Sequence, residues 1–239
     1  MPVRAFFDLC LELFYPSRCH LCGEIAEVNS VICDACEDKI ERIGDNRCDI
    51  CGKRFEAQYI GSRLCGDCIL HKPAFDCARA FARYKEPMSE MVQRLKYKRE
   101  FQFLDWMTNA LLQVYQREYS GENFALIIPV PLHWRRILWR GYNQALILAK
   151  PLSKKLGIPL APDILVRTRH TSHQVGLSPA KRKENIKASF RVKNRNLVEG
   201  KKILLVDDIV TTGVTVDEAA KTLKKSGADR VCVLALART

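Results

Sequence analysis

The fold of this chain is decided by the stretch Ile203-Leu204-Leu205-Val206-Asp207-Asp208-Ile209-Val210-Thr211-Thr212-Gly213-Val214-Thr215. Its apolar start is typical of a parallel strand that is covered on both faces. Two carboxylates and a loop of threonines and glycine follow. A helix is predicted over 216–225, with a capping box from Thr215 to Glu218 and a stop at Gly227. The stretch therefore predicts an α/β unit whose strand ends at a ligand.

The loop after the two aspartates has the composition of an anion site. Backbone N–H groups at a helix N-terminus point outward, and the helix dipole favours negative charge. The threonine hydroxyls add donors, and Gly213 allows the backbone to approach a phosphate closely. Asp207 and Asp208 would repel a phosphate and suit hydroxyl groups better. The residues therefore predict a phosphorylated sugar as the ligand.

This stretch resembles the PRPP-binding motif of type I phosphoribosyltransferases, where PRPP is phosphoribosyl diphosphate. The resemblance implies that Asp207 and Asp208 hold the 2′- and 3′-hydroxyls of ribose. It also implies that the 5-phosphate is wrapped by the loop Ile209, Val210, Thr211, Thr212, Gly213, Val214 and Thr215. The alternative is an ordinary strand-turn-helix with two solvated aspartates.

Eight of the 11 cysteines form two copies of one pattern, a CxxCG pair followed by a second CxxC pair. The copies are Cys19, Cys22, Cys33 and Cys36, then Cys48, Cys51, Cys65 and Cys68. Four thiolates suffice for a closed tetrahedral site, so the pattern predicts two structural zinc ions over disulfides or iron–sulfur ligation. The repeat favours one ion per copy, although cross-braced pairing remains open. Cys10, Cys77 and Cys232 are predicted to be inert.

The composition indicates a folded chain without a membrane span. Apolar residues make up 47% of the 239 residues, which is enough for a core. No apolar stretch approaches the roughly 18 residues that a spanning helix needs. Residues 1–15 follow helical spacing but carry Asp8 and Glu12, which favours a short amphipathic helix over a signal peptide. We therefore expect a cytoplasmic protein.

The positive charge of the chain is concentrated in one segment. The net charge is +12, yet residues 133–202 contain 17 lysines and arginines against three acidic residues, a local net charge of +14. A basic segment of this kind predicts a polyanionic partner or an anionic ligand. A lysine-rich surface that only aids solubility is the alternative.

The order of the predicted elements favours an α/β domain with a parallel sheet. A strand or linker is expected over 72–84 and strands over 125–131, 164–166, 189–192, 203–206 and 231–236. Helices are expected over 87–96, 102–119 and 143–156, the last kinked at Pro151 and stopped at Gly157. We expect a head with two zinc ribbons over residues 1–71 and a phosphoribosyltransferase-like domain over 72–239.

Two further segments complete a resemblance to the ComF family, bacterial proteins of natural competence and DNA uptake. The segments are Val130 to Gln144, which includes Arg140-Gly141-Tyr142-Asn143-Gln144, and a predicted loop over 167–185. By resemblance, the first contains the pyrophosphate loop Val130, Pro131 and Leu132. The second is the flexible loop, with Arg167, Thr171, Gln174, Arg182 and Asn185. The match spans nearly the whole chain, and its departure is Pro151 within the helix after the pyrophosphate loop.

Three functions remain open from the sequence. One is a PRPP-binding module that handles single-stranded DNA during uptake. The cations proposed to contact DNA are Arg135, Arg136, Arg140, Lys181, Arg182 and Lys183. Trp134, Trp139 and Tyr142 either stack on bases or pack in the core.

The second function is an active phosphoribosyltransferase that transfers ribose phosphate to a base or amine, with Mg²⁺ on the PRPP diphosphate. The third is an adaptor whose zinc ribbons dock a helicase or recombination protein of DNA uptake. No segment of the sequence identifies an acceptor substrate.

Overall fold

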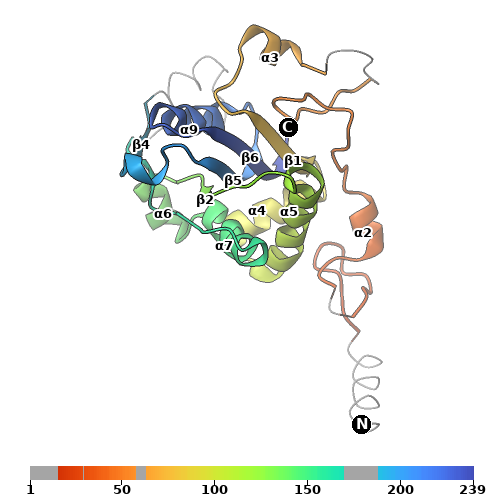
Figure 1. Ribbon diagram of the computed structural model, residues 1–239. Helices are drawn as coiled ribbons and strands as arrows, with labels where there is room; N and C mark the ends of the chain where they lie inside the picture. Colours follow the sequence, from red (N-terminus) through yellow and green to blue (C-terminus); the bar gives the residue numbers. More distant parts are fainter. Residues whose placement is uncertain (1–15, 29, 58–62, 170–187) are drawn as a thin grey trace.

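A four-stranded parallel sheet forms the centre of the protein (Figure 1). The computed structural model describes residues 16–28, 30–57, 63–169 and 188–239. The strands are β1 (Cys77–Arg83), β2 (Leu126–Pro129), β5 (Lys202–Val210) and β6 (Arg230–Arg238), in the order β1-β6-β5-β2. Every pair in this sheet is parallel, which confirms the predicted α/β class.

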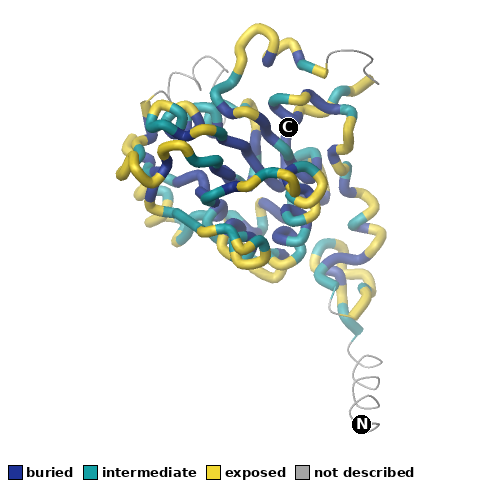
Figure 2. The backbone as a smooth tube through the Cα atoms, viewed as in Figure 1, coloured by how far each residue is buried: buried dark blue, intermediate teal, exposed yellow. Residues whose placement is uncertain are grey.

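Helices cover both faces of the sheet, so the inner strands are buried on both sides (Figure 2). One face packs against α4 (Met88–Gln93), α5 (Leu104–Tyr119) and α7 (Gln144–Leu156). The other face packs against α9 (Val214–Lys225). Cys77 and Cys232 pair across β1 and β6 and are buried, as predicted.

The strands predicted over 164–166 and 189–192 lie outside the main sheet. They are β3 (Leu165–Arg167) and β4 (Phe190–Val192), which pair antiparallel as a separate two-stranded sheet. Leu165 and Phe190 are buried in the same cluster as α9 residues, so this sheet lies on the α9 side. A short 3₁₀ turn, Arg195–Leu197, leads back toward β5.

The expected start of α9 was wrong in detail. Helix α9 begins at Val214, with Gly213 as its N-cap at φ 79°, so no capping box forms at Thr215. The acids of its first turn instead accept backbone hydrogen bonds, Asp217 from Ala74 at 2.5 Å and Glu218 from Ala188 at 2.8 Å. Helix α7 continues through Pro151 and ends before Gly157, as predicted for its stop.

No helix was predicted over 134–140, where the structure has the short helix α6 (Trp134–Arg140). The side chain of His133 accepts the N–H of Arg135, and Gly141 ends the helix at φ 91°. A π-helical turn, Arg94–Lys98, and a 3₁₀ turn, Phe101–Phe103, separate α4 from α5.

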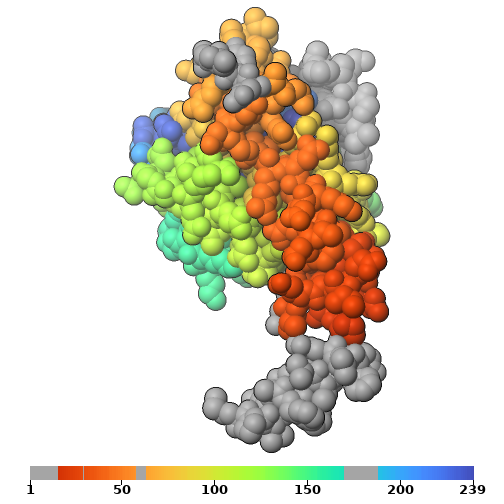
Figure 3. Space-filling view, turned by 90° about the vertical axis from the view of Figure 1, so that its right-hand side faces the viewer, coloured from red at the N-terminus to blue at the C-terminus, as the bar shows by residue number. Residues whose placement is uncertain are grey.

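The cysteine-rich head lies along the edge strand β1 (Figures 1 and 3). It contains two short helices, α2 (Asp34–Asp38) and α3 (Gly66–Leu70). Arg42 forms an antiparallel bridge with Ala82, and the N–H of Ala78 donates to the carbonyl of Ile50 at 2.7 Å. The head therefore satisfies backbone groups that an edge strand would otherwise expose. The division at residues 71 and 72 stays a prediction.

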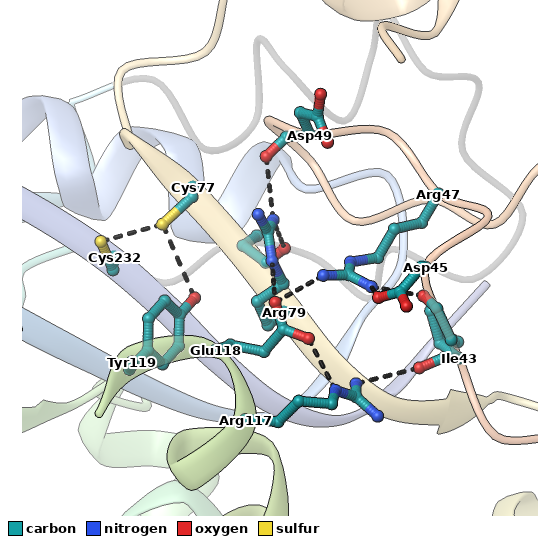
Figure 4. A network of polar contacts seen from close by, with 12 residues as sticks. Ile43, Asp45, Arg47, Asp49, Cys77, Arg79, Arg117, Glu118, Tyr119 and Cys232 are labelled. Atoms are coloured by element: carbon teal, nitrogen blue, oxygen red, sulfur yellow. Dashed lines mark hydrogen bonds and ion pairs between the residues drawn. The ribbon is translucent and has the colours of Figure 1, made fainter. Parts of the chain in front are cut away.

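Glu118 at the end of α5 joins the head to the sheet (Figure 4). Its Oε2 contacts Arg47 of the head at 2.5 Å and Arg79 of β1 at 3.1 Å, while Arg117 donates to its Oε1 at 2.7 Å. The Glu118 side chain is 9% exposed. Burial would raise the pKa of Glu118, but hydrogen bonds from Arg117 and Arg79 and the charge of Arg47 lower it below the ordinary value.

Replacing Glu118 with Gln should destabilise the protein. The substitution leaves three arginines around a buried site without their counter-charge, which typically costs about 3 kcal/mol or more. For a chain of this size we expect the midpoint of thermal unfolding, Tm, to fall by roughly 6–12 °C at neutral pH. Because folding lowers the pKa of Glu118, its contribution is present at neutral pH and is lost on acidification through the carboxyl range.

The matched control is Glu56→Gln, since Glu56 contacts Arg83 at 3.0 Å but its side chain is 79% exposed. A solvated pair of this kind contributes about 0–1 kcal/mol. Scanning calorimetry of both variants over a pH series measures the difference. An E118Q protein as stable as E56Q at neutral pH would contradict the role given to Glu118.

Candidate functional site

The sequence segments predicted to bind ligand meet at the carboxyl end of the parallel sheet. Pro129 of β2 pairs with Val206 of β5, so the residues after each strand leave the same edge. The N–H of Val130 donates to the carbonyl of Val206 at 2.9 Å. The segment Val130 to Leu132 therefore lies beside Asp207 and Asp208, at the edge where parallel α/β sheets bind ligands.

The loop between β5 and α9 is open to solvent. Thr211 and Thr212 are exposed, and Gly213 adopts a left-handed conformation at φ 79° that few other residues tolerate. The loop leads into the N-terminus of α9, a helix of 12 residues whose first N–H groups have no partner within the helix. This arrangement suits a phosphate group.

The two aspartates lie within β5 and point to opposite faces of the strand. Oδ1 of Asp207 accepts the N–H of Asp208, and Oδ1 of Asp208 accepts the N–H of Ile209, both at 2.9 Å. Asp208 is buried and its Oδ2 lies 2.5 Å from Nζ of Lys96. Burial, with the charge of Asp208, raises the pKa of Asp207 well above its ordinary value, and Lys96 partly opposes this.

The predicted pyrophosphate loop, Val130 to Leu132, is held by Asn143. Its side-chain amide donates to the carbonyl of Val130 at 3.0 Å, and its carbonyl oxygen caps α7 by accepting the N–H of Ala145 at 3.1 Å. The predicted Arg-Gly-Tyr-Asn-Gln segment thus connects α6, α7 and the loop. These contacts give the segment a role in holding the fold together, whatever family it resembles.

Two arginines, Arg167 of β3 and Arg136 of α6, lie close enough to interact electrostatically, and Arg167 also interacts with Asp207. Arg167 is the last residue of β3, is buried, and lies over the ring of Phe190 at 5.5 Å. Burial and the nearby charge of Arg136 lower the pKa of Arg167 to about 10, against the attraction of Asp207. Burial and the charge of Arg140 likewise lower the pKa of Arg136.

The surface of α6 combines aromatic rings with cations. Trp134 and Trp139 are 56% and 67% exposed, so the alternative that they pack in the core is wrong for both. Arg135 lies over Trp134 at 5.3 Å, and Arg140 lies over Trp139 at 5.9 Å and Tyr97 at 5.2 Å. Tyr142 is half-buried against Phe101, and its hydroxyl donates to the carbonyl of Leu95.

The remaining loop residues predicted at the site are outside the described part of the chain. These are Thr171, Gln174, Lys181, Arg182, Lys183 and Asn185, and the N-terminal helix over 1–15 with Cys10 is outside it too. Three residues near the site were not predicted from the sequence. They are Lys96, Tyr97 and Arg99, which follow α4 in and just after the π-helical turn. The run of basic residues at the end of that helix was the available signal.

The eight cysteines of the repeat form two separate clusters of four. Cys19, Cys22, Cys33 and Cys36 make one, and Cys48, Cys51, Cys65 and Cys68 make the other, with sulfurs within 4.8 Å of one another in each. This is the sequential pairing that the repeat favours. Cys19–Cys36 and Cys51–Cys65 sulfur separations are 3.8 and 3.6 Å. Tetrahedral zinc with Zn–S bonds near 2.3 Å places its sulfurs about 3.8 Å apart.

In each cluster, backbone hydrogen bonds lower the pKa of one cysteine thiol. Burial raises the pKa of Cys19 and Cys48, but backbone hydrogen bonds outweigh it and bring the values to about 6 and about 7. The segment from Cys48 to Cys51 is followed by Gly52, where a larger residue would not fit because a Cβ there would lie 2.4 Å from the carbonyl oxygen of Ala78. The donor set and its geometry therefore fit a structural zinc ion in each cluster.

We expect two zinc ions per chain in protein purified without chelators, measured by elemental analysis. Replacing Cys48 with Ser should leave one, because that change removes a ligand of a single cluster. Cys232→Ser, a buried cysteine outside both clusters, is the control and should retain two. Iron in place of zinc, or one ion shared by all eight cysteines, would contradict the assignment.

Within the described residues, no helix is long and apolar enough to cross a membrane. The double zinc ribbon family matches residues 10–69, and the phosphoribosyl transferase domain family matches residues 143–239. Among solved structures, the chain is similar to an adenine phosphoribosyltransferase of Thermoanaerobacter pseudethanolicus. The identity is 15%, over 59% of this chain and 83% of that chain, with a TM-score of 0.37.

Relatives match over nearly the whole length. Competence protein F of Haemophilus influenzae is 34% identical over 94% of this chain and 98% of its own. DNA utilization protein YhgH of Escherichia coli K12 is 34% identical over 95% of this chain and 99% of its own length. Competence protein ComFC of Bacillus subtilis is 27% identical over 82% of this chain and 79% of its own length. With both domains in order and relatives of this similarity, the chain belongs to the ComF family of competence proteins.

Proposed function

We propose that this protein binds PRPP, or a related phosphorylated ribose, at the carboxyl end of its sheet and handles single-stranded DNA through the adjoining basic surface. The observation that carries the first part is the placement of Asp207 and Asp208 directly before an open loop and the N-terminus of α9. Carboxylates for a diol and backbone N–H groups for a phosphate are then a few residues apart. The names of the relatives, competence and DNA utilization proteins, support the second part.

The carboxylates also fit the Mg²⁺ that accompanies a diphosphate, because hard oxygen ligands are the ones Mg²⁺ prefers. When bound, the ion would neutralise charge on the diphosphate leaving group. Asp207 and Asp208 would orient the ribose, and the segment Val130 to Leu132 would hold the diphosphate. Arg136 and Arg167 would supply positive charge at the opposite side of the site.

The aromatic and cationic surface of α6 supports the nucleic-acid part of the proposal. Exposed rings allow bases to stack, and the neighbouring guanidinium groups can follow the phosphate backbone. Trp134 and Trp139 lie on the same short helix as Arg135, Arg136 and Arg140. This helix directly follows the proposed pyrophosphate loop, so DNA on α6 would lie next to bound PRPP.

An active phosphoribosyltransferase is the second candidate. The observation in its favour is Arg167, which was predicted in the flexible loop but is the last residue of β3. It is buried and close enough to Asp207 to interact with its charge. A cation there can neutralise an anionic acceptor or leaving group. Docking of an uptake helicase or recombination protein on the zinc ribbons remains a further proposal from the family resemblance.

Replacing Asp207 and Asp208 together with Asn should abolish PRPP binding in the presence of Mg²⁺. Charge-assisted hydrogen bonds to a diol are typically worth about 1.5–3 kcal/mol each, so the affinity should fall at least 100-fold. Titration calorimetry measures this, and circular dichroism checks the fold. The control is Asp105→Asn, since Asp105 also contacts a lysine, Lys155 at 3.2 Å, but is exposed. Unchanged PRPP affinity in the double variant would disprove the ribose assignment.

Single-stranded DNA should bind with an affinity that falls steeply with salt. Replacing Arg135, Arg136 and Arg140 with Ala should flatten the log–log slope by about 0.7 for each phosphate that is no longer neutralised, as should replacing Lys181, Arg182 and Lys183. The control replaces Lys221, Lys224 and Lys225, at the end of α9 opposite the phosphate loop. Fluorescence anisotropy over a salt series measures the slopes.

The aromatic rings should behave differently from the cations. Trp134→Ala with Trp139→Ala should weaken DNA binding by about 1–3 kcal/mol per stacked base while leaving the slope unchanged, because stacking releases no counterions. If the wild-type protein fails to bind DNA even at low salt, or if the α9 control changes the slope as much as the α6 variant, the DNA proposal is wrong.

A further inference from the structure

Lys96 forms an ion pair with Asp208, one of the two carboxylates that the ligand is expected to contact. Its Nζ lies 2.5 Å from Oδ2 of Asp208, and the side chains are 16% and 10% exposed. Oδ1 of Asp208 is already taken by the N–H of Ile209. Oδ2 is buried and accepts no hydrogen bond within the described residues. It contacts Lys96 through the ion pair. A ribose hydroxyl that reaches Asp208 must therefore compete with Lys96.

The ion pair has a clear role before ligand binds. A buried carboxylate without a counter-charge is costly, and it avoids that cost by taking up a proton. Lys96 supplies the counter-charge to Asp208 in the free protein. Once a hydroxyl replaces it, the ammonium group needs another anion nearby, because it is itself largely buried.

The backbone places Lys96 next to the proposed diphosphate site. Lys96 belongs to the π-helical turn Arg94–Lys98, a rare conformation that is frequent at functional sites. The hydroxyl of Tyr142 donates to the carbonyl of Leu95, and Arg99 donates to the carbonyl of Arg140 at 3.3 Å. Asn143, adjacent to Tyr142, holds the carbonyl of Val130 at 3.0 Å. The turn and the pyrophosphate loop are thus tied to the same corner between α6 and α7.

The turn itself is firmly held. Glu90 accepts two hydrogen bonds from Arg94, at 3.0 and 2.6 Å, and Arg99 ends the turn in a left-handed conformation at φ 56°. A Cβ on Gly141 would lie 2.8 Å from Nη2 of Arg99, so this glycine allows the close approach. The backbone is fixed while the lysine side chain, with its four-carbon stem, can swing.

We propose that Lys96 couples the two halves of the PRPP site. In the free protein it pairs with Asp208, and when ribose displaces it, it moves to the diphosphate held at Val130 to Leu132. This inference rests on the proposed PRPP site. It predicts that the diphosphate is required to compensate for the displaced lysine, so that the protein favours PRPP over ribose 5-phosphate, which carries no diphosphate.

The test compares the affinities for PRPP and ribose 5-phosphate, with Mg²⁺ present, by titration calorimetry of the full chain. Lys96→Gln is the main variant, because its amide can still donate to Asp208 but has no charge. We expect the ratio of PRPP affinity to ribose 5-phosphate affinity to fall about tenfold or more, the value of one charged hydrogen bond. Lys96→Met should lower the ratio as well, with ribose 5-phosphate binding as tightly as in the wild type or tighter.

The matched control is Lys202→Met. Lys202 lies at the start of β5, the strand that contains Asp208, and forms an ion pair with Glu122 at 3.1 Å. This variant should leave the ratio unchanged. If Lys96→Gln changes both affinities by the same factor, Lys96 is a structural residue and the proposal is wrong. A wild-type protein that binds neither compound would instead overturn the PRPP site itself.

Discussion

The parallel pairing of β5 with β2 on one side and β6 on the other is the constraint on which the site depends. Parallel neighbours end at the same edge, so the residues after Pro129 and those after Val206 are brought together although they are far apart in the chain. The pairing also buries Ile203 to Val206 completely. Aspartates at the next two positions are then held where the strand leaves the core, with little freedom to move.

This placement gives the site its unusual electrostatics. Asp207 has a raised pKa and Arg167 a lowered one because both lie where water is largely excluded. Opposite and like charges are mixed within a small volume, and neither strand β5 nor strand β3 can rotate to relieve the repulsion. The proposed ligand PRPP, with a phosphate at one end, a diphosphate at the other and neutral hydroxyls between, would match that mixture.

The sequence was sufficient for the features that depend on local pattern. The apolar run into Asp207, the cysteine spacing and the glycine after α7 each follow from the chemistry of a few adjacent residues. The start of α9 was misplaced because Asp217 and Glu218 bond to Ala74 and Ala188, segments distant in the chain, and so could not be recognised as anything other than caps. Lys96 was missed for the same reason. Its partner, Asp208, lies far along the sequence, and only the folded sheet brings the two together.

The head has a closer relation to the sheet than a separately folded zinc module would have. Cys19, Cys33 and Cys36 of the first cluster belong to the same buried core as α4, α5 and α7. All four cysteines of the second cluster belong to the buried core that includes α9. The head also closes the β1 edge by the Arg42–Ala82 bridge and joins α5 through Glu118. Zinc that orders the head therefore also protects one edge of the sheet, while the segment Pro159 to Ala161 covers the other through hydrogen bonds with Ile127. Because both edges of the sheet are covered, its carboxyl end is where polar groups next to the core, such as Asp207 and Asp208, can reach a ligand.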